Sequence, residues 1–411
     1  GIVEGAYSSA YSNAGIIGQE GWQQSGDHFV TTSVRTQLGN WNVIPRVSYQ
    51  LNHRKEFEQP QDEISLDENA PEKVSLDISL RTLRWDVSAD RTWGGGWSMA
   101  GGGQGFKMSS AFDDEEGVEL IHEALIPNAG ADENSFYVVG SRNADRWGVQ
   151  AAARVDVRTT YALETVEAWS DNRRTDVLQG FSAGGHWEVG ERLTWNAHAA
   201  QSQRVPGLAE LLTSGMHHCA FRFEQGDVQL KKETSWNTES NLNWKGHLLS
   251  IEGNLYRNAI EDYVTMVPTD EFRDDYPVFE WQAMDARFLG GEFAASLNES
   301  TVENWTAQLA WSWVDAQNSE GESLPLIPPM STRATVGYRL GSWRTSAVFQ
   351  HSMDANLVHC AFGGTIADQL ELTVSVQNLL NMEYMPTLSL LRNLGISEPG
   401  RNVRVQMAWT F

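Results

Sequence analysis

The chain ends in the stretch NVRVQMAWTF at residues 402–411, in which two kinds of side chain alternate without a break. Every odd-numbered position carries an apolar or aromatic residue, and every even-numbered position carries a polar or small one. Because successive side chains of a β-strand point to opposite faces, this stretch predicts a strand that lies between two media. A membrane-spanning barrel requires such strands, since one face meets lipid, the other faces the lumen, and closure leaves no free edge.

The same alternation recurs earlier in the chain, at residues 147–157 and 305–313. A large soluble β-sandwich is the alternative interpretation. The 17 tryptophans among 411 residues favour a membrane protein, because aromatic side chains gather in girdles at the two membrane interfaces.

Composition agrees with a barrel better than with membrane helices. The hydrophobic fraction is 41%, the mean hydropathy is -0.41, and no stretch approaches the about 18 apolar residues of a membrane helix. In a barrel only every second residue of a strand meets lipid, which reconciles this composition with a membrane location. We therefore predict an all-β, transmembrane antiparallel β-barrel that occupies residues 1–411 as one domain.

The net charge of -24 bears on possible partners. Binding a phosphate backbone relies on clustered Lys and Arg, so the charge argues against nucleic acid as a partner and favours cations. The simpler interpretation is that the acidic residues keep surface loops solvated.

Connections between the expected strands fall into two classes. The short ones read as tight turns at 38–41, 93–96, 143–146, 189–192, 245–247, 340–342 and 367–369. The long ones, rich in Asp, Glu, Gly and Pro, lie at 56–72, 109–133, 204–231, 266–280 and 315–329. Bacterial barrels have short periplasmic turns and long extracellular loops, so the pattern predicts about eighteen strands with the long loops outside the cell.

The carboxy-terminal part of the chain carries a recognisable series of motifs. They are Val376-Gln-Asn-Leu-Leu-Asn381, Tyr384, Leu388-Ser-Leu-Leu-Arg-Asn393, Glu398-Pro-Gly-Arg-Asn402 and the final aromatic residue. This series resembles the signature of TonB-dependent outer-membrane receptors. Further matches are Arg204-Val-Pro206 with Glu210-Leu211, Leu230 with Glu233, Tyr256-Arg-Asn258, and Pro325 with Pro328-Pro329.

The resemblance implies a location in the bacterial outer membrane, with outer-membrane lipid around a multi-pass barrel of 22 strands and a plug inside it. It also implies import of a scarce nutrient with energy from the TonB complex of the inner membrane. No plug-like segment precedes the first expected strand, and residues 1–10 lack the features of a signal peptide. We therefore expect the barrel portion of a longer receptor, with the plug and the first barrel strands missing. A passive general porin is the alternative.

Substrate class depends on the loop Ser214-Gly-Met-His-His-Cys-Ala-Phe-Arg-Phe-Glu-Gln-Gly-Asp227. His217, His218, Cys219 and Glu224 offer imidazole, thiolate and carboxylate donors, the ligand set that transition metals prefer, although their spacing is too tight for all four to bind one ion. The segment resembles the zinc-receptor branch of the family. Cys219 and the preceding Met216 are softer ligands, which leaves copper open beside zinc.

The transported ligand could thus be a metal ion or a metal chelate. An ordinary polar loop tip is the simpler interpretation of the two histidines, and haem, a siderophore or cobalamin are alternative ligands. The spacing of Cys219 and Cys360 does not say whether they pair. His359 and Cys360 point to opposite faces of their expected strand, so at most one of them faces the lumen.

Nothing in the sequence predicts an enzyme or a bound cofactor. The glycines at 94–96 and 101–103 are not followed by the Lys-Ser/Thr pair and helix of a phosphate-binding loop. We find no local support for a Ser/His/Asp triad.

Overall fold

The computed structural model describes residues 2–8, 22–58, 73–112, 125–166, 169, 171–217, 220, 222–298, 302–367, 369–389, 391–392 and 395–409. Nearly all of these lie in one sheet of 21 strands. The first strands are β1 (Ile2–Ser8), β2 (Trp22–Ser33), β3 (Thr36–Leu38), β4 (Trp41–Glu58), β5 (Lys73–Trp93), β6 (Trp97–Phe112), β7 (Ala129–Asn143), β8 (Trp147–Ala162), β9 (Arg173–Glu188) and β10 (Leu193–Arg204). A 3-10 turn, η1 (Gly94–Gly96), joins β5 to β6.

The remaining elements include the short helix α1 (Leu208–Leu212) and two short strands, β11 (Ser214–His217) and β12 (Arg222–Gln225). The strands that follow are β13 (Glu233–Lys245), β14 (Leu249–Arg273), β15 (Tyr276–Leu297), β16 (Trp305–Asn318), β17 (Ser331–Leu340), β18 (Trp343–Ser352), β19 (Asn356–Ala367), β20 (Leu370–Gln377) and β21 (Asn402–Trp409).

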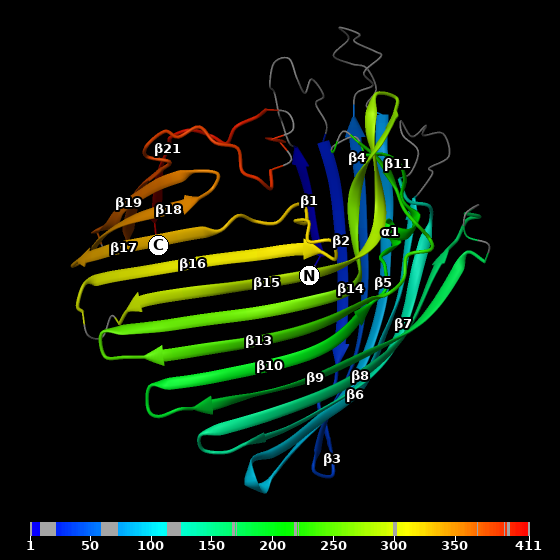
Figure 1. Cartoon of the computed structure of the whole chain (residues 1–411), viewed down its shortest axis with the longest axis horizontal. Helices are drawn as coiled ribbons and strands as arrows, with labels where there is room; N and C mark the ends of the chain where they lie inside the picture. Colours follow the sequence, from blue (N-terminus) through cyan, green and yellow to red (C-terminus); the bar gives the residue numbers. More distant parts are fainter. Residues whose placement is uncertain are drawn as a thin grey trace.

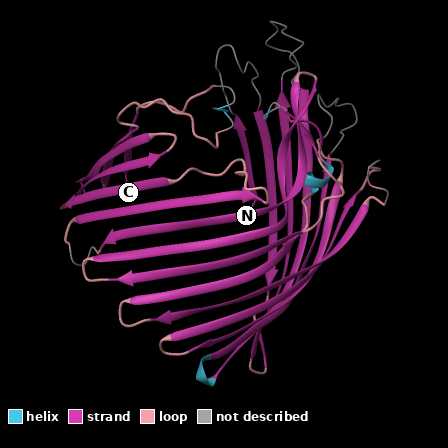
Figure 2. Ribbon diagram, viewed as in Figure 1, coloured by secondary structure: helices cyan, strands magenta, loops and turns pink. Residues whose placement is uncertain are grey.

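The sheet curves around a lumen, and neighbouring strands of its wall run antiparallel to each other (Figures 1 and 2). Strand β3 continues β2 along the edge of β4, and β11 and β12 form a hairpin between β10 and β13. In the described ranges, eighteen strands therefore make up the wall. The prediction of about eighteen antiparallel strands is confirmed. In the part of the chain that the structure describes, no pairing joins β1 to β21.

At one end of the wall, tight turns join neighbouring strands at the positions that the sequence predicts. Gly39, Gly95 and Gly341 lie in three of these turns with φ of 63°, 76° and 61°. Only glycine adopts this left-handed conformation at little cost, so the sequence supplies glycine where the chain reverses most sharply. Longer connections, including the one that carries α1, lie at the opposite end (Figure 1).

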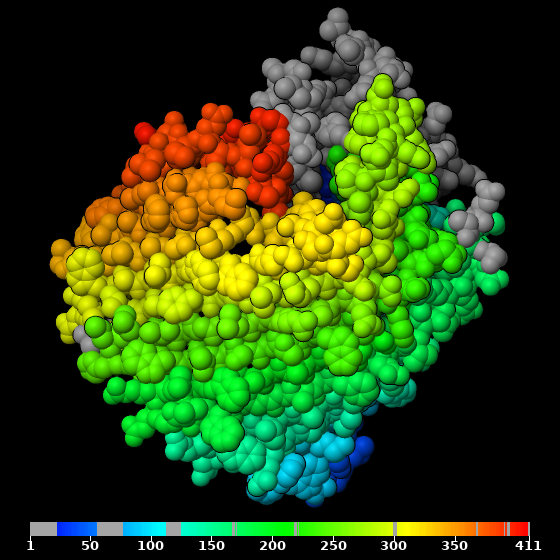
Figure 3. Space-filling view, viewed as in Figure 1, coloured from blue at the N-terminus to red at the C-terminus, as the bar shows by residue number. Residues whose placement is uncertain are grey.

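The expected long loop at residues 266–280 is not a loop. Strand β14 continues to Arg273 and β15 begins at Tyr276, so the segment is a hairpin with Asp274 and Asp275 at its tip. Both aspartates have positive φ, 49° and 67°, which Asp tolerates better than most residues. The yellow-green hairpin rises beyond the neighbouring surface at the end with the long connections (Figures 1 and 3).

Side chains on the outer face of the wall are apolar. On β8, Val149, Val155 and Val157 are exposed, whereas Asp156 on the inner face is 9% exposed. The inner face is held together by polar contacts instead: Nε of Arg154 donates to Asp156 at 2.6 Å. The alternation that the sequence predicts is therefore that of a strand with lipid on one face and a polar lumen on the other.

Tryptophans gather on the outer face close to the tight turns. Trp93 pairs with Trp97 across β5 and β6, and Trp147 pairs with Trp187 across β8 and β9. The guanidinium of Arg142 lies 5.2 Å from the ring centre of Trp97 and 5.3 Å from that of Trp147. Such an aromatic band, with a cation held between rings, is typical of the boundary between lipid and water.

Candidate functional site

The connection between β10 and β13 carries the predicted metal-binding loop and folds onto the inside of the barrel mouth. Its helix α1 buries Leu211 and Leu212, which are 3% and 5% exposed. They form a hydrophobic cluster with Ala129, Ala162 and Val264, which lie on β7, β8 and β14. The loop therefore packs on strands from both sides of its own attachment point, and its hydrophobic residues hold it at the mouth.

A polar network anchors the same connection at its two ends. Arg204, the last residue of β10, contacts Glu233, the first residue of β13, with nitrogen to oxygen distances of 2.7 and 2.8 Å. Its Nη1 also lies 2.8 Å from Oε2 of Glu210 in α1, and that oxygen accepts the backbone N–H of Gly207. Glu233 accepts the backbone N–H of Val264 in β14 at 2.7 Å. One guanidinium thus joins both ends of the connection to its helix.

The hairpin of β11 and β12 presents the candidate ligands. His217 is the last residue of β11 and pairs with Arg222, the first residue of β12. Its Nδ1 lies 2.8 Å from Oε1 of Glu224, and Nε of Arg222 donates to the same oxygen at 2.8 Å. The Glu224 carboxylate is therefore buried, at 6% exposure, between one imidazole and one guanidinium. The side chain of His217 is 42% exposed, so its ring remains open on one side.

The arginines that position this hairpin were missed from the sequence. Strand β12 runs parallel to β15, which begins more than fifty residues later, and Glu224 pairs with Phe279. The guanidinium of Arg222 lies 4.9 Å from the Phe279 ring, and that of Arg273 lies 4.4 Å from the Phe223 ring. A cation is attracted to the face of an aromatic ring, so these two contacts hold the loop against the β14–β15 hairpin. No local pattern signals them, because the partners come from distant segments.

The other predicted ligands are only partly described. His218 and Cys219 lie outside the described residues. Within the described ranges, no group of three or more His, Cys, Asp and Glu side chains is arranged to hold a metal ion. Cys360 is a free thiol. Nδ1 of His359 accepts the backbone N–H of Asn378 at 3.2 Å, which gives that histidine a structural role.

Residues 4–379 match the family described as TonB dependent receptor-like, beta-barrel. The chain belongs to the TonB-dependent receptor β-barrel family. Three solved structures illustrate the likeness. The copper transporter OprC superposes with a TM-score of 0.75 at 16% identity, over 96% of this chain and 66% of that one. The FrpB iron transporter from Neisseria meningitidis gives 0.70 at 14% identity, over 95% and 64%.

A third structure is the hemophore receptor HasR of Serratia marcescens, a double mutant in complex with its hemophore HasA and heme. It gives a TM-score of 0.68 at 12% identity, over 95% of this chain and 66% of that one. At such identities the likeness shows the fold, while the family match identifies the chain. The chain spans 64–66% of the length of these three relatives, slightly less than two thirds.

Membership of the family confirms the predicted fold class and location. The chain is an outer-membrane β-barrel of a bacterium, and its family is made up of transport receptors rather than enzymes. Among the described residues, no helix is long and apolar enough to cross a membrane.

Proposed function

We propose that this barrel takes up a divalent metal, zinc first and copper second, either as the ion or as a small chelate. The observation that carries the proposal is the exposed imidazole of His217, held at the barrel mouth by the buried carboxylate of Glu224. His218 and Cys219 follow in the same loop and would add a second imidazole and a thiolate. Imidazole and thiolate are preferred ligands of zinc, and thiolate and thioether of cuprous ion.

The contacts of Glu224 suggest that it orients His217 rather than binding the metal. Its Oε1 already accepts from two donors, and the positive charge of Arg222 would oppose a cation at that oxygen. A carboxylate that accepts from Nδ1–H fixes the tautomer of the ring and leaves Nε2 as the ligating nitrogen. The ligand set would then be His217 with His218 or Cys219, and Glu224 would support it from behind.

Long-range electrostatics favour the same class of substrate. The net charge of -24 gives the protein an attractive field for cations, which raises their local concentration at a cleft. Release of the captured metal would require a plug and energy from the TonB complex, as in the rest of the family. We propose that the complete receptor contains that plug, with residues 1–411 as its barrel part.

Isothermal titration calorimetry with zinc and, in parallel, cuprous ion tests the proposal. Replacing His217 and His218 together by Ala should weaken zinc binding at least about tenfold, or 1.4 kcal/mol. The matched control is His351→Ala, which removes an imidazole hydrogen-bonded to Asn356 elsewhere in the barrel. Unchanged affinity for both metals in the double variant would remove this loop from the mechanism. The ligand would then be sought among haem, siderophores and cobalamin, or the barrel would be a passive porin.

A further inference from the structure

A second group of nitrogen and oxygen donors lies on the lumen wall, well away from the mouth. His186 on β9, His198 on β10 and Glu239 on β13 line one pocket of about 360 Å³. Asn143 and Asn196 are among the other residues that line it. The three donors come from three consecutive strands of the wall, so the ladder between the strands sets their separation.

The register of these strands brings the three side chains onto one patch of the inner face. His198 pairs directly with Glu239 across β10 and β13. His186 pairs with Asn196, which precedes His198 by two residues on the same face, so the two histidines are diagonal neighbours. Directly opposite residues have Cβ atoms about 5 Å apart and diagonal ones about 7–8 Å apart, within reach of long side chains.

Glycines on the adjoining strands make room for both imidazole rings. A Cβ added at Gly148 would lie 2.4 Å from Cε1 of His186, and one added at Gly184 would lie 2.8 Å from Cδ2 of His198. Real Cβ atoms do not approach other atoms this closely, so any other residue would displace the ring. Each imidazole thus lies against the backbone of its neighbour, where a larger side chain would exclude it.

The charges around the pocket favour a cation. Of the described residues that line it, Glu239 alone carries a formal charge at neutral pH, and the polar remainder consists of hydroxyl, amide and imidazole groups. Within the described structure, the side chains of His186, His198 and Glu239 make no hydrogen bond or ion pair, and all three residues are exposed. No other described side chain of the barrel therefore occupies their donor atoms.

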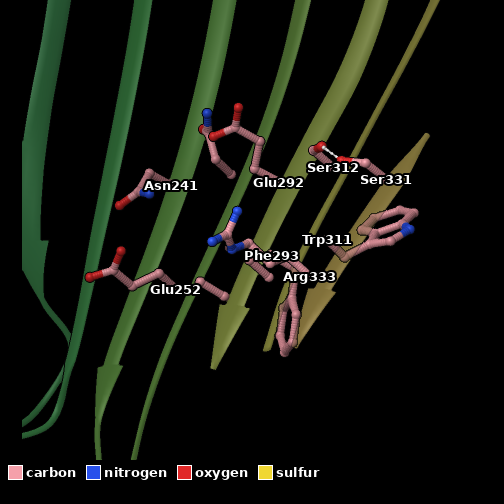
Figure 4. A pocket seen from close by; sticks show the side chains of 12 residues that line it. Asn241, Glu252, Glu292, Phe293, Trp311, Ser312, Ser331 and Arg333 are labelled. Atoms are coloured by element: carbon pink, nitrogen blue, oxygen red, sulfur yellow. Dashed lines mark hydrogen bonds between the residues drawn. The ribbon is translucent and has the colours of Figure 1, made fainter. Parts of the chain in front are cut away.

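The adjoining pocket of about 400 Å³ differs in the charges and donor groups that line it. It shares Asn241 with the histidine pocket and contains the carboxylates of Glu252 and Glu292, but it also contains the guanidinium of Arg333 (Figure 4). None of the described residues that line it is a histidine. Carboxylates beside an arginine suit a hydrated or salt-bridged wall, whereas two imidazoles with one carboxylate are the donor set of a zinc site.

We propose that His186, His198 and Glu239 form a second, weaker divalent-metal site through which a metal captured at the mouth passes along the lumen wall. This inference rests on the proposed function. The three side chains are not gathered for coordination in the structure, so binding would require them to rotate together. A weak site suits transit, because an ion that is to move on must bind well enough to enter and loosely enough to leave.

The test is histidine footprinting of the full protein in detergent with diethyl pyrocarbonate, read by mass spectrometry with and without zinc. Zinc at about ten times its Kd should slow modification of His186 and His198 about tenfold, since a bound imidazole nitrogen cannot react. Modification of His247, in the turn between β13 and β14, should be unchanged. Glu239→Gln should raise the zinc concentration for half protection about tenfold, and Glu292→Gln in the adjoining pocket should not.

The outcomes separate this inference from the proposed function. Protection of His217 alone would overturn the wall site and leave capture at the mouth intact. Protection of the two wall histidines without His217 would support the wall site and contradict capture by that loop. If His186 and His198 fail to react even without zinc, they are closed to the lumen, and the wall site is overturned.

Discussion

Arg204 and Glu233 contact each other through two nitrogen to oxygen pairs of 2.8 and 2.7 Å. They pair across β10 and β13, directly before and directly after the loop of residues 205–232. Glu233 is 8% exposed and also accepts the backbone N–H of Val264. The pair therefore holds the base of the loop that carries His217. The position of the loop of residues 205–232 depends on this contact as well as on the hydrophobic cluster around Leu211.

Glu233→Gln should loosen the loop without dismantling the barrel. The substitution removes the charge of one of the two carboxylates that Arg204 contacts and leaves Glu210 as the other, which costs about 1–3 kcal/mol. This cost is smaller than the cost of breaking a fully buried ion pair, because the Arg204 side chain is 46% exposed. Limited proteolysis should cut within residues 205–232 faster than in the unmodified protein. Glu239→Gln, an exposed carboxylate on the same strand, is the control, and equal cleavage rates in both variants would contradict this role of Glu233.

Glu224→Gln should weaken zinc binding by about tenfold, because partners that orient a ligand contribute about 10–100-fold to affinity. The expected cause is a less strongly held His217 ring. Calorimetry gives the affinities. Glu271→Gln at the exposed tip of the β14–β15 hairpin removes the same charge without touching His217 and should leave the affinity unchanged. An equal loss in both variants would point to the general field rather than to orientation of His217.

Zinc affinity should fall as the pH drops below about 6.5, the reference pKa of histidine, because a protonated imidazole has no lone pair for the metal. Metal and proton compete for the same nitrogen, so lower pH favours the zinc-free protein. Zinc titrations between pH 5.5 and 7.5 would measure how the affinity depends on pH, since these two limits lie about one unit below and above the reference pKa. Affinity that is flat across this range would exclude histidine as the principal ligand.

Labelling of cells should confirm the orientation of the barrel. A tag inserted between Asp274 and Asp275, at the tip of the β14–β15 hairpin, should be labelled on intact cells, because the long connections face outward. A tag at Gly341, in the turn between β17 and β18, should be labelled only after the outer membrane is opened. The reverse pattern would invert the topology.

The wall of the barrel could be predicted from the sequence to a large extent. The alternation of residues 147–157 indicates which side chains of β8 face lipid, and the structure bears this out at Val149, Val155 and Asp156. Turn glycines such as Gly39 and Gly341 mark the periodic reversals. The one clear error, the expected loop at 266–280, arose because its Asp and Pro content resembles a loop. In the structure, β14 and β15 stay paired through this segment, with a bulge near Pro268.

The sequence itself therefore determined the strand faces, the turn positions and the donors within the loop of residues 214–227, which follow from the period of two and from short-range composition. Only the tertiary structure decided which donors meet. Glu224 faces His217 because a hairpin brings them together, Arg222 reaches Phe279 because β12 pairs with β15, and the histidines of the lumen wall adjoin through strand register. Such contacts depend on how strands align across a curved sheet, and alignment is set by the hydrogen-bond ladder of the whole barrel, which no short stretch encodes.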